Sequence, residues 1–451
     1  MRRGMHLAIL ITGALVLTGQ AVQAAGEDPI QLAIDRGVTY LKKTQNFNGT
    51  TPQNVGAAAL NGLALLECGV PADDPAVQRA AEVVRESSVG LTYTYSLALS
   101  ILFLDRLGDP DDVPLIQSLT VRLLAGQKAD HGWTYECPPI SEAEMHRLSS
   151  LVQQHPQLTA RNTAPQNSLP GKRLASPLPR EIKDQLKLLS KMAPAPMITD
   201  NSNTQFATLA LWVARRYDLP VDRALERVEL RFRNSQNADG GWGYFPLGRG
   251  MNLSTPTMTC AGLLGLAVAH GVTNARLHAS TTLERNPPAR NNSFRDPAIR
   301  AGLVAAGATI GYPVGNKKDP RHPVPIIGRG GRGFYYLWSL ERVAVIYGLK
   351  TINKKDWYAW GSEILLASQL TDGSWQGQYP EGGVDTCFAL LFLRRANLAQ
   401  DLTVSLRGQV FDPGDLNLPG ATPPREVPNS KVLGTGLNPD GKPEGGPSQG
   451  A

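Results

Sequence analysis

Two patterns of hydrophobic and polar residues alternate along the chain and predict two kinds of helix. In Glu226–Arg233, charged and apolar residues recur at helical spacing, which is typical of a helix with one solvated face. No charged residue occurs between Asn252 and Ala269, so a helix in this segment is apolar on every side. Pro256 and the Thr and Gly residues near it favour burial inside the protein over a membrane span.

Each pattern occurs six times. We expect polar-faced helices near residues 29–44, 75–87, 113–126, 221–235, 296–310 and 355–369. We expect apolar helices near residues 53–68, 92–107, 202–217, 256–271, 334–348 and 384–397. A buried inner ring of apolar helices inside an outer ring of polar-faced helices predicts an all-α (α/α)6 toroid of six helical hairpins over residues 29–400.

Residues at the junctions between hairpins carry signals for helix ends. Asp74-Pro75 and Asp296-Pro297 precede polar-faced helices, where Asp caps the first N–H groups and Pro suits the first turn. Asp109-Pro110-Asp111-Asp112 predicts the same capping role. We expect left-handed glycine caps after four apolar helices, at Gly69, Gly108, Gly271 and Gly348.

A short signature, Q-x-x-D-x-(G/S)-W, recurs between a polar-faced helix and the next apolar helix. Its three copies are Gln127–Trp133, Gln236–Trp242 and Gln369–Trp375. A motif that recurs between recurring helices indicates a repeat architecture. Gln side chains can hydrogen-bond the backbone at a helix end, and Trp buries a large area, so we expect a structural role for both.

The signature resembles the QW motif of the squalene/hopene cyclase and protein prenyltransferase superfamily, whose members are α/α toroids with the same helix–motif–helix unit. The residues that carry the resemblance are Gln127, Gly132, Trp133, Gln236, Gly241, Trp242, Gln369 and Trp375, with Ser374 in place of the last Gly. The resemblance implies the same toroid, and it implies that these motif residues brace the repeats and do not catalyse.

The catalytic signatures of that superfamily are matched only in part. Cyclases use a D-x-D-D acid, and Asp109–Asp112 matches it, but this segment lies at a hairpin junction, away from the variable loops. Cyclase cavities are lined with aromatic rings that stabilise cations, whereas 6% of this chain is aromatic. The second helical domain of the known cyclases has no counterpart here.

Metal and thioester chemistry are not predicted. Protein prenyltransferases bind zinc through an Asp-x-Cys pair and a later His. Asp385-Thr-Cys387 matches the pair, but the last His of the chain is His322, and zinc usually takes three or four protein ligands. The Gly-Cys-Gly-Glu-Gln of the thioester proteins that share this toroid is absent. We therefore expect no metal and no cofactor.

The loops that lead from polar-faced to apolar helices vary greatly in length and lie at one end of the predicted toroid. They include an insertion at 138–199, with two short helices expected at 141–154 and 180–192, and a basic Gly-rich loop at 311–333. Binding residues tend to lie on loops held by a rigid scaffold, so this end is the predicted functional face. Gly328–Gly333 matches G-x-G-x-x-G, but no strand precedes it, which excludes a dinucleotide fold. Arg329 and Arg332 there offer charge for an anion, although a plain loop is the alternative.

The richest aromatic segment begins the fifth apolar helix. Tyr335, Trp338 and Arg342 fall on one face of it, and Glu341 and Arg342 are charges in a buried setting. Buried charges are costly unless they are paired, so Glu341 and Arg342 indicate either a ligand pocket or a structural ion pair.

Four further polar residues flank the starts of apolar helices: Asp200, Asn203, Glu381 and Asp385. Two carboxylates facing each other across a cavity would suit acid–base chemistry, as in (α/α)6 glycan-processing enzymes. Helix capping is the structural alternative for each of them. We take all four, with Arg332 and the aromatic segment, as candidate ligand-binding residues.

The N-terminus indicates export. Arg2 and Arg3 precede an apolar run at 7–17, and Val22-Gln23-Ala24 has the small residues of a cleavage site, so we predict a signal peptide at 1–24 and a periplasmic or secreted protein without a transmembrane anchor. The formal charge of +6 falls to +4 when Arg2 and Arg3 are removed, which is too small to indicate nucleic-acid binding.

The cysteines and the C-terminal tail complete the organisation. Cys260 and Cys387 occupy equivalent repeat positions and are expected to pack as small buried residues. The sequence does not decide whether Cys68 and Cys137 form a disulfide. Residues 408–451 are rich in Pro and Gly, which predicts a disordered tail.

Two functions are compatible with the sequence. The first is an exported toroid that binds a small molecule, lipid, glycan or protein at its loop-rich end without the superfamily's catalytic residues. The alternative is a divergent enzyme, either a terpene cyclase-like isomerase or a glycan lyase or hydrolase that uses paired carboxylates.

Overall fold

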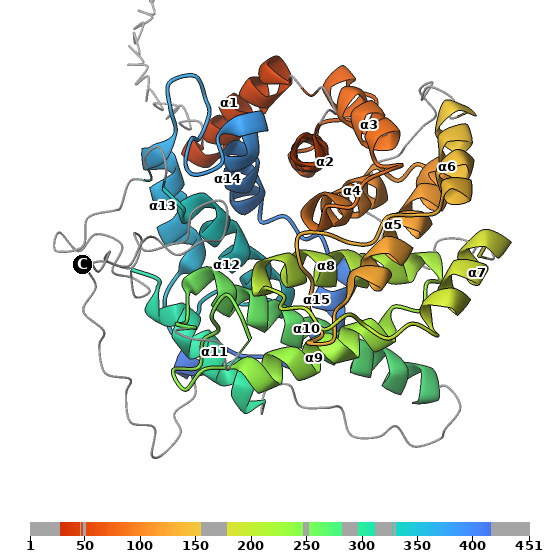
Figure 1. Ribbon diagram of the computed structural model, residues 1–451. Coiled ribbons are helices and arrows are strands. Elements are labelled where there is room, and N and C mark those ends of the chain that lie inside the picture. Colours follow the sequence, from red (N-terminus) through yellow and green to blue (C-terminus); the bar gives the residue numbers. More distant parts are fainter. Residues whose placement is uncertain are drawn as a thin grey trace, which may run out of the picture.

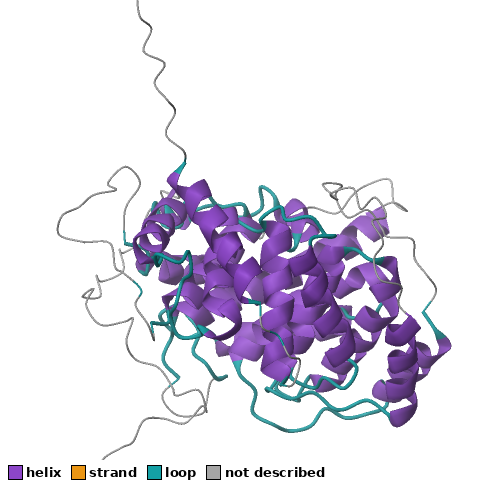
Figure 2. Cartoon of the chain, turned by 90° about the horizontal axis from the view of Figure 1, so that it is seen from above, coloured by secondary structure: helices purple, strands orange, loops and turns teal. Residues whose placement is uncertain are grey.

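A computed structural model describes residues 28–45, 47, 51–154, 178–246, 252–281, 296–311, 327 and 331–415. These residues form 15 α-helices, short 3-10 turns and no strand beyond isolated bridges, which confirms the all-α prediction (Figure 2). The predicted signal peptide, residues 312–326 and 328–330 of the Gly-rich loop, and residues 416–451 of the tail lie outside the described residues.

Twelve of the helices form two rings (Figure 1). The outer helices are α1 (Pro29–Thr44), α3 (Pro75–Ser87), α5 (Val113–Gly126), α9 (Asp222–Ser235), α11 (Pro297–Ala308) and α13 (Trp357–Ser368). The inner helices are α2 (Pro52–Glu67), α4 (Thr94–Leu107), α8 (Asn201–Ala214), α10 (Pro256–Thr281), α12 (Gly333–Tyr347) and α14 (Val384–Arg394). Each inner helix packs against the next, and α14 packs against α2, so the inner ring is closed.

The burial of the two rings follows the hydrophobic pattern. Every residue of the inner helix α8 is buried, whereas the outer helix α9 buries only the face that carries Leu225, Val228 and Phe232. One described helix segment, Pro256–Leu277 of α10, is long and apolar enough to cross a membrane, and 83% of its apolar window is buried inside the protein. This burial is what a core helix of the inner ring requires.

The motif tryptophans link each outer helix to the following inner helix through hydrogen bonds. Each indole N–H donates to the carbonyl ten residues earlier, in the pairs Trp133–Leu123 (2.7 Å), Trp242–Phe232 (2.8 Å) and Trp375–Leu365 (2.8 Å). Each backbone N–H donates to a threonine hydroxyl of the next inner helix, in the pairs Trp133–Thr204 (3.1 Å), Trp242–Thr259 (3.4 Å) and Trp375–Thr386 (3.1 Å).

The motif glutamines join neighbouring repeats. Each side-chain amide donates to a carbonyl at the start of the next outer helix, in the pairs Gln127–Ala224 (2.9 Å), Gln236–Ala298 (2.8 Å) and Gln369–Ala33 (2.8 Å). The last pair links the final repeat to α1 and therefore closes the outer ring. One residue in each motif turn has positive φ, and His131 stands there at +69° where the other copies have Gly240 and Gly373.

Two of the expected helix ends differ in the structure. Asp109 caps the 3-10 turn Pro110–Asp112 by accepting the N–H of Asp111, but the side chain of Asp112 caps no helix and is paired with Arg85 at 2.7 Å. Gly271 was expected to end an inner helix, but α10 continues past it. Leu402 of α15 (Gln400–Leu406) lies so close to Gly271 that a Cβ would meet it at 2.4 Å.

The insertion contributes two helices outside the rings, α6 (Glu142–Gln154) and α7 (Arg180–Leu189). They pack against α3 and α5 respectively. All four cysteines are free, so Cys68 and Cys137 form no disulfide, and Cys260 and Cys387 are buried as expected.

Candidate functional site

The loops that follow the motifs bring tyrosines to the N-terminal ends of the inner helices. The carbonyl of Tyr135 accepts the N–H of Thr94 at 2.8 Å, and the carbonyl of Tyr244 accepts the N–H of Asn201 at 2.8 Å. The third loop repeats this arrangement, because the carbonyl of Tyr379 accepts the N–H of Asp385. We call this end of the ring the mouth, and its mouth tyrosines are Tyr93, Tyr95, Tyr135, Tyr244, Tyr335 and Tyr379.

The mouth tyrosines form an amphipathic surface. The ring centroids of Tyr93, Tyr95 and Tyr135 lie 5.8–5.9 Å apart, and the hydroxyls of Tyr135 and Tyr244 are 3.0 Å apart. Burial, and then the negative charge of Asp200, raises the pKa of Tyr244 well above its usual range, so its hydroxyl stays protonated. Tyr135 is 37% exposed and Tyr379 is 43% exposed, so part of each residue is accessible to a ligand.

Buried aromatic rings fill the centre of the inner ring below this surface. Phe206 lies 5.0 Å from Tyr95 and 5.8 Å from Trp338, measured between ring centroids. Trp338 stacks on Phe388 at 5.0 Å with an angle of 21° between the rings. These residues belong to α4, α8, α12 and α14, so side chains from opposite sides of the ring meet across its axis.

A chain of hydrogen bonds leads from the mouth to Arg342. Tyr95 donates its hydroxyl to Ser202 at 2.7 Å, and the hydroxyls of Ser202 and Tyr335 are 2.9 Å apart. Gln205 donates to the Tyr335 hydroxyl and accepts from Arg342 Nη2 at 3.1 Å. Arg342 also lies 4.0 Å above the centroid of the Trp338 ring. The face shared by Tyr335, Trp338 and Arg342 therefore points to the ring axis.

Glu341 and Arg342 do not form the hydrogen-bonded ion pair that was one of the two interpretations of this segment. Neither carboxyl oxygen of the fully buried Glu341 has a hydrogen-bond partner, and burial raises its pKa well above the usual range. Arg342 is on the adjacent side of the helix, where its Nε and Nη1 have no partner and burial lowers its pKa. Burial therefore favours the protonated form of the Glu341 carboxyl.

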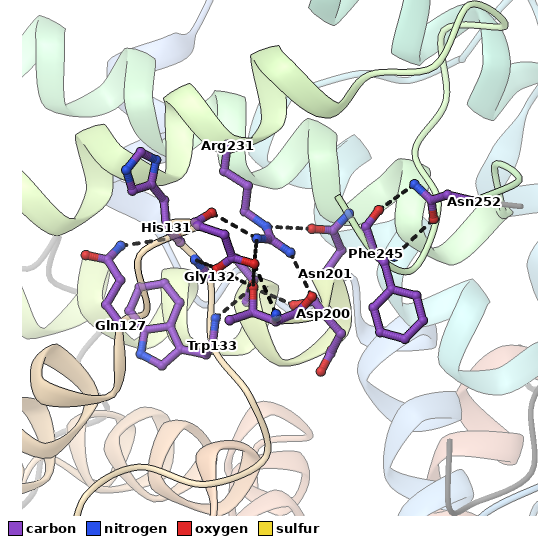
Figure 3. A network of polar contacts seen from close by, with 12 residues as sticks. Gln127, His131, Gly132, Trp133, Asp200, Asn201, Arg231, Phe245 and Asn252 are labelled. Atoms are coloured by element: carbon purple, nitrogen blue, oxygen red, sulfur yellow. Dashed lines mark hydrogen bonds and ion pairs between the residues drawn. The ribbon is translucent and has the colours of Figure 1, made fainter. Parts of the chain in front are cut away.

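The start of α8 is held by structural hydrogen bonds (Figure 3). Asp200 caps α8 by accepting the backbone N–H of Asn203 at 2.7 Å and its side-chain amide at 2.8 Å. Arg231 of α9 is buried beside it and donates Nε to Asn201 at 2.8 Å and Nη1 to the carbonyl of Asp130 at 3.0 Å. Asp200 and Asn203 therefore cap the start of α8.

The remaining polar candidates lie around the rim of the mouth. Asp385 Oδ2 accepts the N–H groups of Gly377 and Tyr379, both at 2.8 Å, and so shapes the loop that carries Tyr379. Arg332 and Glu381 are exposed at the starts of α12 and of a 3-10 turn. Within the described residues, no group of three or more His, Cys, Asp or Glu side chains could hold a metal ion.

Asp385 provides a pH-dependent prediction. Burial raises the pKa of its carboxyl to about 6, against the opposing effect of hydrogen bonds from Gly377 and Tyr379. Because the folded pKa exceeds the unfolded value, folding favours the protonated acid, and its stabilising contribution is lost as the pH rises through 6. We expect Asp385→Asn to raise the free energy of unfolding at pH 8 by on the order of 1–3 kcal/mol and to have no such effect below pH 4. Urea unfolding at both pH values measures this difference, and a destabilised variant at pH 8 would contradict it.

Most of the mouth was not identified from the sequence. Tyr135 and Tyr244 each follow a motif tryptophan by two residues, and this recurrence is the sequence signal that could have identified them. Ser202, Gln205 and Phe388 carry no comparable signal, because they come together only when different helices meet at the axis. Two open surface hollows of about 460 and 650 Å3 lie elsewhere, beside Arg233 and Arg216, and neither includes a mouth tyrosine.

Comparisons with known proteins assign no family to this chain. No family model matches the chain, and no curated protein matches it. A solved structure that is similar is the type II terpene cyclase MstE from Scytonema in complex with its substrate geranylgeranyl dihydroxybenzoate. The two chains are 12% identical, with a TM-score of 0.40 over 84% of this chain and 98% of the cyclase chain. A likeness at this level assigns no function to this protein.

Proposed function

We propose that this chain is a non-catalytic binding protein whose ligand is an extended polypeptide segment lying across the mouth tyrosines. The observation that carries the proposal is the contrast between two layers. Tyr135 and Tyr379 are exposed at the mouth, whereas Phe206, Trp338 and Phe388 fill the axis directly below. A ligand is therefore expected to lie on the ring and not inside it.

The chemistry of the mouth suits a polypeptide. Tyrosine combines a flat apolar face with a hydroxyl, and it is enriched in protein interfaces and in the grooves that hold Pro-rich segments. Gln376 and Gln378, beside Tyr379, are only partly buried and offer amide groups for peptide carbonyls. Asp200 and Asp385 accept hydrogen bonds from their own loops and helix, which makes them poor acid–base catalysts.

The proposed function is tested by panning a random-peptide display library on a chain that begins at residue 25 and so keeps every described residue. We expect the selected peptides to bind Tyr135→Ala/Tyr379→Ala more than tenfold more weakly, since tyrosine hot spots contribute about 1–2 kcal/mol each. Phe411→Ala, which alters an exposed ring far from the mouth in sequence, is the matched control and should bind normally. Peptides that bind the double variant undiminished would refute the proposal, as would selective binding to a glycan array.

An isomerase with Glu341 as its acid is the second candidate function. It is supported by one observation, namely that neither carboxyl oxygen of the buried Glu341 has a hydrogen-bond partner. Burial raises the pKa of this carboxyl, which favours the protonated form that a general acid needs. Glu341→Gln distinguishes the two functions, because the variant should keep peptide binding and would lose an isomerase activity.

We also propose that the protein acts in the periplasm or outside the cell, as the pattern of residues 1–24 predicts. Mass spectrometry of the protein recovered from an expressing bacterium should find a chain that begins near residue 25. An intact N-terminus at Met1 in the cytoplasmic fraction would refute export.

A further inference from the structure

The insertion exposes apolar side chains at the edge of the molecule. Residues 191–198, which read Lys-Met-Ala-Pro-Ala-Pro-Met-Ile, are all exposed. Leu188 at the end of α7 is 63% exposed, and Met192, Met197 and Ile198 are 60%, 52% and 44% exposed. We call these four residues the apolar strip. Folded monomers rarely present so many neighbouring apolar side chains to water unless the surface binds something.

The apolar strip is held in place and is not a frayed end. Ile182 on the opposite side of α7 is fully buried, and α7 packs against α5. Between Met192 and Met197, the carbonyl of Ala195 accepts the N–H of Ala129 at 3.0 Å. Directly after it, Thr199 donates its backbone N–H to the Asp130 carboxylate at 3.0 Å. Both ends are thus fixed to the protein, and the exposure of the side chains is a property of the fold.

A row of cations borders the apolar strip. Lys183 and Lys187 are four residues apart and therefore lie along one side of α7, and Lys191 lies in the turn that follows the helix, next to Met192 in sequence. All three are exposed, and in the described part of the chain no acidic side chain forms an ion pair with them. The nearby Arg180 pairs at 3.7 Å with Asp184.

We propose that the apolar strip and its lysines dock the protein on an anionic lipid surface. Apolar side chains beside lysines are the pattern of interfacial membrane contacts, in which the apolar groups enter the headgroup boundary and the ammonium groups meet lipid phosphates. Figure 1 places α7 at the outer edge of the molecule, where a flat surface can approach it. Because the apolar strip lies on a projecting edge, it suits contact with a membrane surface better than binding of a partner helix, which needs a groove.

Sedimentation with vesicles tests the proposal on the chain that begins at residue 25. The vesicles are phosphatidylcholine alone or phosphatidylcholine with 30–50% phosphatidylglycerol, as a rough bracket for an anionic membrane. We expect binding to the anionic vesicles that weakens with salt, and at least a tenfold loss for Leu188→Ser/Met192→Ser/Met197→Ser. Lys183→Glu/Lys187→Glu/Lys191→Glu should lose binding as well. Leu230→Ser, which changes an isolated exposed leucine of α9, should bind like the parent.

Two outcomes would overturn the proposal. The first is that the parent chain binds neither kind of vesicle. The second is that the apolar triple variant, shown by circular dichroism to melt like the parent, binds anionic vesicles undiminished. Sedimentation equilibrium without lipid adds a further check, because self-association that disappears in the triple variant would reassign the apolar strip to a contact between two copies of this chain.

Discussion

Replacing Trp375 with alanine should lower the free energy of unfolding by about 3–5 kcal/mol, the usual cost of removing a buried tryptophan. Trp375 is buried, and its indole N–H donates to the carbonyl of Leu365. Its ring also lies against Gly37 of α1, where a Cβ would approach it to 2.8 Å. The substitution therefore loosens α1, α13 and α14 together, at the place where the ring closes. Urea unfolding followed by circular dichroism measures the effect.

Trp375→Phe separates the packing of the ring from its hydrogen bond. Phenylalanine keeps much of the buried area and removes the indole donor, so we expect a smaller loss of about 1–2 kcal/mol. If Trp375→Ala cost less than about 1 kcal/mol, the motif would not brace the junction between the last and first repeats.

Replacing Arg85 with alanine should destabilise the protein by a similar amount, about 3–5 kcal/mol. The buried guanidinium donates Nε and Nη2 to Asp112 at 2.7 and 2.8 Å, and Nη2 also donates to Asp109 at 2.9 Å. Without Arg85, the two buried carboxylates lose the guanidinium that both of them bind. The loss should appear in urea unfolding near neutral pH.

A combined variant isolates the charge effect in this cluster. Arg85→Met/Asp109→Asn/Asp112→Asn removes the guanidinium together with the two carboxylates that it binds, and we expect it to regain much of the stability that Arg85→Ala loses. Asp112→Asn alone should leave peptide binding at the mouth unchanged, because Asp112 binds Arg85 directly before α5 and is not among the mouth residues. A triple variant as unstable as Arg85→Ala would show that packing, and not charge, explains the loss.

The rings were predictable because their determinants are local. Apolar residues on every side of α8 and α10, and on one face of α9, fix which helices lie inside. The role of Asp112 was not predictable, because it depends on Arg85, 27 residues earlier on another helix. The prediction that Gly271 ends a helix was wrong for the same reason. Gly271 packs closely against Leu402, a contact that is distant in sequence, and this contact outweighs the tendency of glycine to end helices.

The candidate site was only partly predictable. The spacing of Tyr335, Trp338 and Arg342 correctly places them on one face, because helical periodicity is local. Their partners Ser202, Gln205 and Phe388 could not be found, since no pattern in the sequence shows which side chains meet across an axis. The adjacency of Glu341 and Arg342 in sequence suggested a pair, yet consecutive residues diverge by about 100° around a helix, which separates their side chains.

The hydrogen bond from Gln369 to Ala33 joins residues that are 336 positions apart. During synthesis at about 5–20 residues per second, α1 would leave the ribosome roughly 15–70 s before the partner that completes its surroundings. Throughout that interval the apolar faces of the first hairpin have no neighbour on one side. A ring that is closed by its last repeat therefore stays an open arc until the final hairpin is synthesised, and chaperones that shield nascent chains are expected to bind it until then.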